Sequence, residues 1–135
     1  FSNTLSVGDK IQLNWEDSAV SSGNINIMDS LGSASTGKDL FGVELLSFSD
    51  TVGDNTSTAN IVSLLNDFYD NTSVTNHADK VFVLASDGSD SSLWSVNNND
   101  DGVYNVVTTA ELELVANFTG QSDTSVIDDL IDSLY

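Results

Sequence analysis

The spacing of apolar residues constrains the fold most strongly, because its period changes along the chain. Apolar and polar side chains alternate in residues 10–15, and this period of two predicts a half-buried strand. Residues 24–28 alternate over a shorter length. Residues 40–48 predict a longer strand, in which the consecutive Leu45 and Leu46 change the phase of the alternation and indicate a bulge. We therefore expect the first part of the chain to be β-structure.

Two later segments have the period of an amphipathic helix instead. The first has apolar residues at the i, i+3, i+4 and i+7 positions of one helix face, namely Ile61, Leu64, Leu65 and Phe68. A cap among residues 56–58 and an end near Asp70 would bound this helix. The second segment is C-terminal, with a cap at Ser122 or Asp123. Its apolar face consists of Val126, Ile127, Leu130, Ile131 and Leu134.

Between the two helices, turns rich in Asp, Asn, Ser and Gly separate segments that resemble strands and predict a meander. These segments are residues 80–85, 92–96, 103–107 and 111–118. The predicted fold class is α+β and β-dominated, with antiparallel strands in a sandwich or meander and two amphipathic helices. A chain of 135 residues fits a single domain. A possible subdivision separates an N-terminal β portion, residues 1–52, from a portion with both helices and the meander, residues 53–135.

The charge balance excludes several classes of partner. The chain has 21 Asp and Glu residues against three Lys and no Arg, for a formal net charge of −18. Nucleic acids and anionic membrane surfaces are excluded, because almost no cation can neutralise their phosphates. No apolar run reaches the length that membrane insertion requires. Most of the acid is Asp in loops, which favours cation-binding loops, above all for calcium. Solubility at high salt is the other interpretation.

The densest acidic run partly fits a calcium loop of the EF-hand type. Gly102 takes the position of the sharp turn, while Thr108 stands where a closing Glu is expected and Glu111 lies three residues later. The candidate ligands offer oxygen atoms around that turn: Asn97, Asn99, Asp101, the carbonyl of Val103, and Glu111. A polar hairpin turn, in which Asn and Asp bind their own backbone, is the alternative.

Asp87 and Asp90 form a second candidate cation site, because a Gly between two carboxylates can let both reach one ion. The same residues are typical of a hairpin turn. The pair Asp128 and Asp129 is expected on the solvent-exposed face of the last helix.

The sequence offers little for catalysis, so we expect no enzyme. His77 is the only histidine, and no G-x-S-x-G motif is present. A deep pocket lined by two Asp in different environments would instead favour a hydrolase. Trp15 and Trp94 could form a platform for a sugar, although their alternating strand positions favour the core.

The segment 79–120 carries a family resemblance. The matching residues are Ala78-Asp79, the strand 81–84, the turn 87–91, Trp94, the loop 97–102, Ala110-Glu111-Leu112, Leu114-Val115-Ala116 and Gly120. This arrangement resembles a C-terminal module of large calcium-binding bacterial proteins of the repeats-in-toxin (RTX) type. Such proteins include surface-layer and adhesin-like proteins exported by type I secretion. The resemblance implies that Glu111 closes a calcium loop.

The resemblance, together with the acidic loops, implies an extracellular structural, assembly or adhesion domain of a secreted bacterial surface protein, stabilised by Ca²⁺. Its partners would be other copies of the chain, other surface proteins or glycans. A calcium-assisted carbohydrate-binding module and a filament subunit assembling by β-strand addition are the alternatives. The C-terminal segment fits either a secretion signal or a helix packed on its own domain.

Overall fold

A computed structural model describes residues 11–13, 26–32, 34–35, 43–72, 80–97 and 106–134. In this part of the chain a five-stranded sheet has the strand order β2-β3-β4-β5-β6. Its strands are β2 (Ile27–Leu31), β3 (Leu45–Thr51), β4 (Lys80–Ser86), β5 (Ser91–Asn97) and β6 (Leu112–Phe118). The helices are α1 (Thr58–Thr72), α2 (Thr124–Leu130) and the short 3-10 helix η1 (Thr109–Glu111). The strands β1 (Ile11–Leu13) and β7 (Ile131–Leu134) form a separate parallel pair.

The fold class is confirmed as α+β and β-dominated, and the sheet is mixed. Strands β4, β5 and β6 form the expected antiparallel meander. Strands β2, β3 and β4 are parallel, which the sequence did not predict. The helix α1 connects β3 to β4, and a crossover of this kind makes the two strands parallel. Strands from both sides of residue 52 share this sheet.

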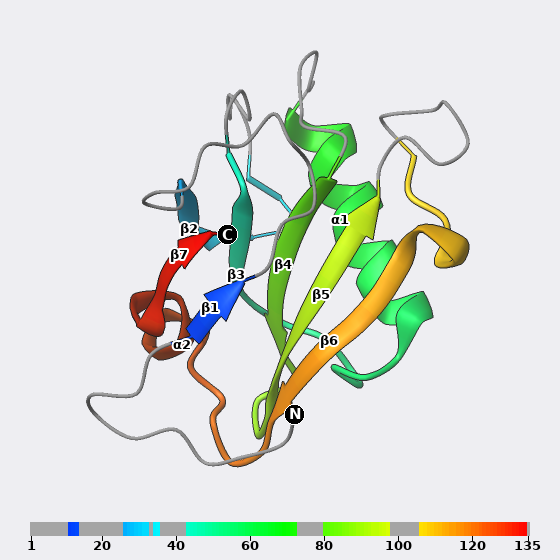
Figure 1. Cartoon of the computed structure of the whole chain (residues 1–135). Coiled ribbons are helices and arrows are strands. Elements are labelled where there is room, and N and C mark those ends of the chain that lie inside the picture. Colours follow the sequence, from blue (N-terminus) through cyan, green and yellow to red (C-terminus); the bar gives the residue numbers. More distant parts are fainter. Residues whose placement is uncertain are drawn as a thin grey trace.

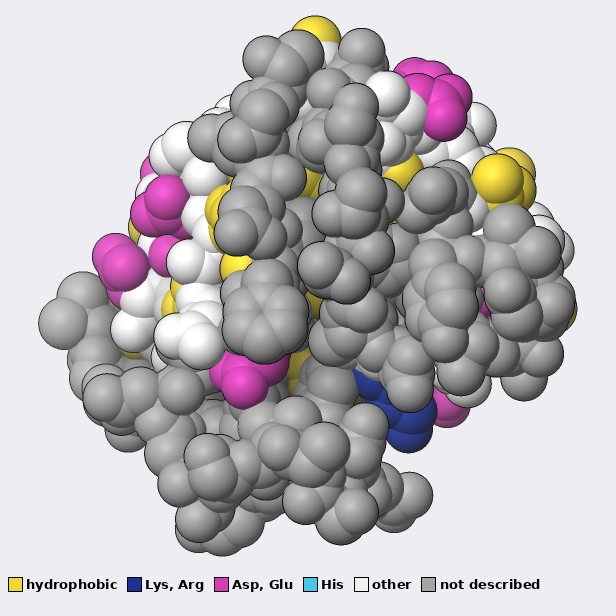
Figure 2. All heavy atoms as spheres, turned by 90° about the horizontal axis from the view of Figure 1, so that it is seen from above, with side chains coloured by type: hydrophobic (Ala, Val, Ile, Leu, Met, Phe, Trp, Pro, Cys, Tyr) yellow, Lys and Arg dark blue, Asp and Glu magenta, His cyan; other side chains and the backbone are white. Residues whose placement is uncertain are grey.

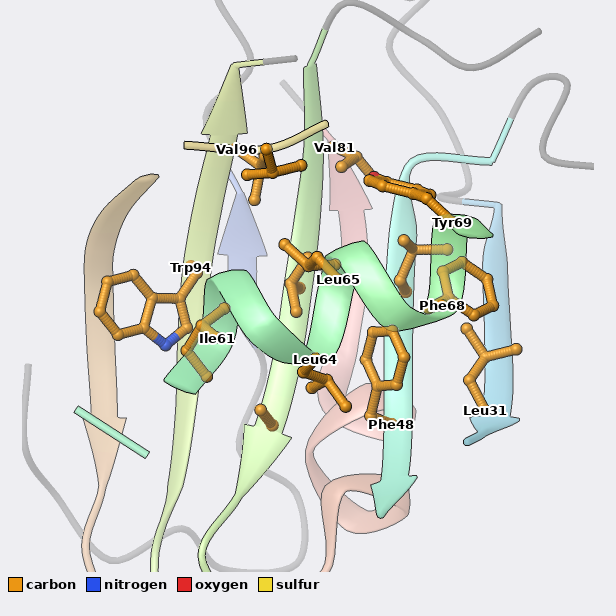
Figure 3. Packing of buried hydrophobic residues seen from close by; sticks show 14 residues of the cluster. Leu31, Phe48, Ile61, Leu64, Leu65, Phe68, Tyr69, Val81, Trp94 and Val96 are labelled. Carbon is orange, nitrogen blue, oxygen red and sulfur yellow. The ribbon is translucent and has the colours of Figure 1, made fainter. Parts of the chain in front are cut away.

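The helix α1 packs on one face of the sheet and supplies five of the fourteen buried residues of the larger core (Figure 3). Phe68 of α1 meets Phe48 of β3 edge to face, with ring centroids 5.3 Å apart. This geometry is favourable for aromatic pairs. The buried residues of this core are Leu31, Leu46, Phe48, Ile61, Leu64, Leu65, Phe68, Tyr69, Val81, Val83, Ala85, Trp94, Val96 and Val107.

The other face of the sheet is covered by α2 and β7 (Figure 1). Ile127 of α2 and Ile131 of β7 are buried against it, and α2 lies over β2, β3 and β4. The buried residues of this smaller core are Leu45, Phe82, Leu84, Leu93, Ala116, Phe118, Ile127 and Ile131. The described chain is therefore layered, with α1 on one side of the sheet and α2 on the other.

Two sequence expectations for these elements are wrong. Leu45 and Leu46 pair in regular register with Phe82 and Val83, so no bulge lies there. Both leucines are buried because β3 is covered on its two faces, which removes the alternation of a half-buried strand. The C-terminal helix was expected to continue through Leu134, but it ends at Leu130. The strand β7 follows it, because this segment pairs with β1.

The expected strand at residues 103–107 is only partly within the described chain. Residues 103–105 lie outside it. Val106 and Val107 belong to no strand. Val107 is nevertheless buried in the larger core, and its backbone N–H donates to Asn66 Oδ1 of α1 at 2.7 Å. The segment before η1 is therefore held by the helix rather than by the sheet.

Each edge strand of the sheet has an irregular register. In β2 the register with β3 shifts between Met28 and Leu31, and Ser30 there adopts a φ of 54°. In β6 the register with β5 shifts: Leu93 lies opposite Ala116 and Trp94 opposite Leu114, so Val115 is the extra residue between them. Bulges of this kind twist an edge strand and hinder the addition of a further strand.

Candidate functional site

Glu111, the residue expected to close a calcium loop, is buried and only half satisfied. It ends η1 and is 4% exposed. Its Oε1 accepts from the Thr108 backbone N–H at 2.9 Å and from Thr108 Oγ1 at 3.0 Å, as in a capping box. Its Oε2 is buried with no hydrogen-bond partner. Buried carboxylate oxygens normally have a donor or a cation beside them, so this oxygen is the unusual feature.

The other expected ligands of this loop are only partly within the described chain. Asn97 is the last residue of β5 and is half-buried. Asn99, Asp101 and Val103 lie outside the described residues.

Asp87 and Asp90 form the turn of the β4–β5 hairpin. Asp87 Oδ1 accepts from the backbone N–H groups of Ser89 and Asp90, both at 2.9 Å. These backbone hydrogen bonds lower the pKa of Asp87, and the bond from Asp90 has a larger effect than the bond from Ser89. Asp90 Oδ1 accepts from the Gly120 N–H at 2.7 Å and so ties the hairpin to the end of β6. Both carboxylates bind backbone, which is the turn interpretation of this motif.

The structure does not bring the two sets of expected ligands together. Asp87 and Asp90 precede β5, whereas Asn97 ends it. Six residues of β5, from Ser91 to Val96, separate Asp90 from Asn97, which corresponds to about 20 Å. A single cation cannot contact Asp90 and Asn97 at the same time.

Trp94 is a core residue, as its alternating position favoured. It is 2% exposed, and its Nε1 donates to the Asn55 carbonyl at 3.2 Å and to Ser92 Oγ at 2.9 Å. Asn55 is also buried, and its Nδ2 donates to Asn117 Oδ1 of β6 at 3.1 Å. The loop before α1 is therefore pinned to β5 and β6, and Trp94 offers no exposed face to a sugar. Trp15 and His77 lie outside the described residues.

A polar cavity lies at the carboxyl ends of the three parallel strands. It has a volume of about 270 Å³. Ser49 and Thr51 of β3 and Ser86 of β4 line it from the sheet, and residues 122–125 line it from the start of α2. Strand ends are a usual position for ligand sites in open α/β sheets. We call this cavity the Asp128 pocket, after the carboxylate in its wall.

Asp128 is buried, which corrects the expectation that it faces solvent. It is 5% exposed, whereas Asp129 is exposed. Burial raises the pKa of Asp128 to about 6; Asp129, Asp29 and Asp123 add to the rise, and a hydrogen bond with the Ser47 side chain opposes it. Its Oδ2 has no hydrogen-bond partner. The apolar spacing of α2 correctly predicted that Ile127 is buried. The contact between α2 and β3, which buries the next residue, Asp128, could not be predicted from the sequence.

A pocket lined by two Asp residues in different environments would favour a hydrolase. The Asp128 pocket has two such residues in its wall, since Asp123 also lines it. However, Asp123 caps α2: its Oδ1 accepts from the Ser125 N–H at 3.0 Å and from Ser125 Oγ at 2.6 Å. A carboxylate engaged in this way is a structural cap. The pair therefore differs from two carboxylates that are free to exchange protons with a substrate.

Within the described ranges, no group of three or more His, Cys, Asp or Glu side chains could hold a metal ion. Figure 2 shows the carboxylates, in magenta, at several separate places over the described part of one face. Among the described helices, none is long and apolar enough to cross a membrane. Comparison with protein-family models, curated proteins and solved structures found no match.

Proposed function

We propose that this chain is an extracellular structural or adhesion domain of a secreted bacterial surface protein, and that calcium stabilises it. The buried Oε2 of Glu111, which has no partner, carries this proposal. The oxygen lies at the end of the acidic segment in which the sequence pattern expects calcium ligands. A cation there would compensate a buried carboxylate whose other oxygen already binds Thr108.

The distribution of charge supports a role in an exterior rich in cations. The net charge of −18 disfavours the compact state through self-repulsion. Cations that screen or bind the carboxylates reduce this repulsion. The described carboxylates of the β4–β5 turn and of the α2 cap bind backbone donors, which is a structural use of the acid. A non-enzymatic role fits this use.

The two binding alternatives receive less support. A carbohydrate-binding module would be favoured by an exposed Trp94, which is instead buried. A filament subunit assembling by strand addition would be favoured by a regular edge strand. Both β2 and β6 have irregular registers instead. Association through side chains, with copies of the chain or with other surface proteins, stays part of the proposal.

The experiment compares thermal unfolding with and without calcium in three proteins. The wild type is expected to gain about 1.4 kcal/mol or more at a calcium concentration of about ten times the dissociation constant. This gain corresponds to a rise in Tm of about 4–7 °C. The Glu111→Gln variant keeps an acceptor for the Thr108 cap and removes the charge, so most of this gain should be lost. Glu113→Gln, two residues along and exposed, is the matched control and should behave as the wild type.

Sodium chloride at the same ionic strength separates specific binding from screening. An equal rise in Tm with sodium and with calcium would overturn the proposal. An equal calcium response in the wild type and in Glu111→Gln would also overturn it, because the site would then lie elsewhere.

A further inference from the structure

Apart from Phe48, the residues that line the Asp128 pocket are Ser, Thr and Asp, and none of them is basic. Several of the hydroxyls already donate to the protein. Thr124 Oγ1 donates to the Phe48 carbonyl at 2.7 Å, and Ser49 Oγ donates to the Leu31 carbonyl at 3.1 Å. A hydroxyl that donates within the protein keeps lone pairs for other donors. The wall therefore presents mainly acceptors.

The Asp128 pocket also carries negative charge that no basic residue of its lining neutralises. Asp128 has an oxygen without a partner. The carboxylates that act on it come from two elements: Asp29 from β2, and Asp123 and Asp129 from the cap and body of α2. A buried carboxylate that is repelled by three other negative charges is costly unless a positive group lies beside it. An anionic ligand is excluded by the same charges.

We propose that the Asp128 pocket binds a small organic cation, whose ammonium group donates to the Asp128 carboxylate and whose hydroxyl groups meet the Ser and Thr wall. This site is separate from the one at Glu111 and does not depend on the proposed function.

Size and ligand number favour an organic ammonium over a bare metal ion. A cavity of about 270 Å³ corresponds to roughly nine water volumes in the liquid, which is far more than one dehydrated ion fills. Calcium requires six to eight oxygen ligands, including several carboxylates, and no set of three acidic ligands is present among the described residues. An ammonium group needs only about three acceptors.

The carboxyl group can present its free oxygen to such a ligand with a small movement. Oδ2 is covered in the structure, and the torsion about the Cβ–Cγ bond of Asp is soft and roughly two-fold. A partial rotation about this bond, which weakens the hydrogen bond with the Ser47 side chain, would turn this oxygen toward the cavity that Asp128 lines. The ligand would supply the donor that the carboxylate lacks.

The test uses two probes of nearly the same shape that differ in charge. The cation of tris(hydroxymethyl)aminomethane carries an ammonium and three hydroxymethyl groups, and pentaerythritol replaces the ammonium by a fourth hydroxymethyl group. Both are titrated into the ¹⁵N-labelled full chain, and the amide shifts of residues around the pocket are followed. At pH 7.5 we expect saturable shifts with the cation and binding about tenfold weaker or more with pentaerythritol. Binding of the cation should weaken below pH 6, as Asp128 becomes protonated.

Asp128→Asn tests the carboxylate itself, and Asp129→Asn, exposed on the same helix, is the control with the same change in net charge. Binding should fall about tenfold in the first variant and clearly less in the second, because Asp129 adds to the negative charge felt by Asp128 but does not line the cavity. Glu111→Gln should also bind normally, which separates this site from the proposed calcium site. Equal binding of the two probes, or equal binding by the two Asp variants, would overturn the proposal. Displacement of the cation by stoichiometric potassium or calcium would show that a metal ion is the occupant and would overturn it too.

Discussion

Replacing Asp128 by Asn is expected to stabilise the ligand-free protein at neutral pH, although it removes a buried polar contact. The pKa of Asp128 rises from 3.8 to about 6 on folding. A rise of about two pKa units corresponds to roughly 3 kcal/mol of cost for the charged form. Solvent that reaches the carboxyl group through the pocket reduces this cost, so about 1–2 kcal/mol is the expected gain. For a chain of this size the Tm should rise by about 3–10 °C.

The pH dependence of this effect follows from linkage. Because the folded state holds the proton of Asp128 more tightly than the unfolded state, its contribution to stability is fully present below pH 3.8. It is lost as the pH rises through about 6. The variant has no such proton. Its advantage over the wild type should therefore be absent near pH 3.5, grow between pH 4 and 6, and be constant above pH 7.

Urea unfolding at a series of pH values measures this difference, with Asp129→Asn as the control. That variant makes the same change in net charge at an exposed position of the same helix, so its free energy of unfolding should change by less than about 0.5 kcal/mol. A stability gain of Asp128→Asn that is equal at pH 4 and pH 7.5 would refute the reasoning. A loss of stability at pH 7.5 would do so as well, since it would mean that the charged form is favoured in the fold.

Three further substitutions test the core and the β4–β5 turn. Phe68→Ala removes a fully buried ring that packs on Phe48 and should cost about 3–5 kcal/mol in chemical unfolding; a cost below 1 kcal/mol would contradict the packing. Gly88→Ala places a side chain at a φ of 93° and should cost about 1 kcal/mol more than Gly53→Ala, where no such strain exists. Asp87→Ala should destabilise the hairpin above pH 4, with the difference vanishing as the pH falls through the lowered pKa of Asp87; a difference independent of pH would show that its charge is not involved.

The elements that depend on local pattern could be predicted from the sequence. The helical spacing of Ile61, Leu64, Leu65 and Phe68 predicted α1, and all four residues are buried in the core that α1 forms. The alternation around Trp94 predicted a core position, and its burial confirms it. The turn chemistry of Asp87 and Asp90 was also visible, because Asp binds backbone within a few residues of itself.

The features that depend on distant contacts could not be predicted. Alternation of apolar and polar residues predicts a strand with one face exposed to solvent. The two consecutive leucines, Leu45 and Leu46, were therefore interpreted as a bulge, whereas they lie in a strand that is covered on both faces. Helical spacing continues through Leu134, but pairing with the distant β1 makes residues 131–134 a strand. Asp128 looked like a surface residue beside Asp129, and only the packing of α2 on β3 shows that it is buried.

The pairing of β1 with β7 has a consequence for the order of folding. The β4–β5 hairpin joins neighbouring residues, and local contacts of this kind form early. The pair of β1 and β7 instead joins residues near the two ends of the described chain. Its formation closes a very long loop, and the chain entropy lost in closing the loop is offset only after the two strands are in contact. We expect this pair to form last. A polypeptide that is still being synthesised or threaded through a channel can build the meander but not this pair, and the fold is complete only when β1 and β7 are in the same compartment.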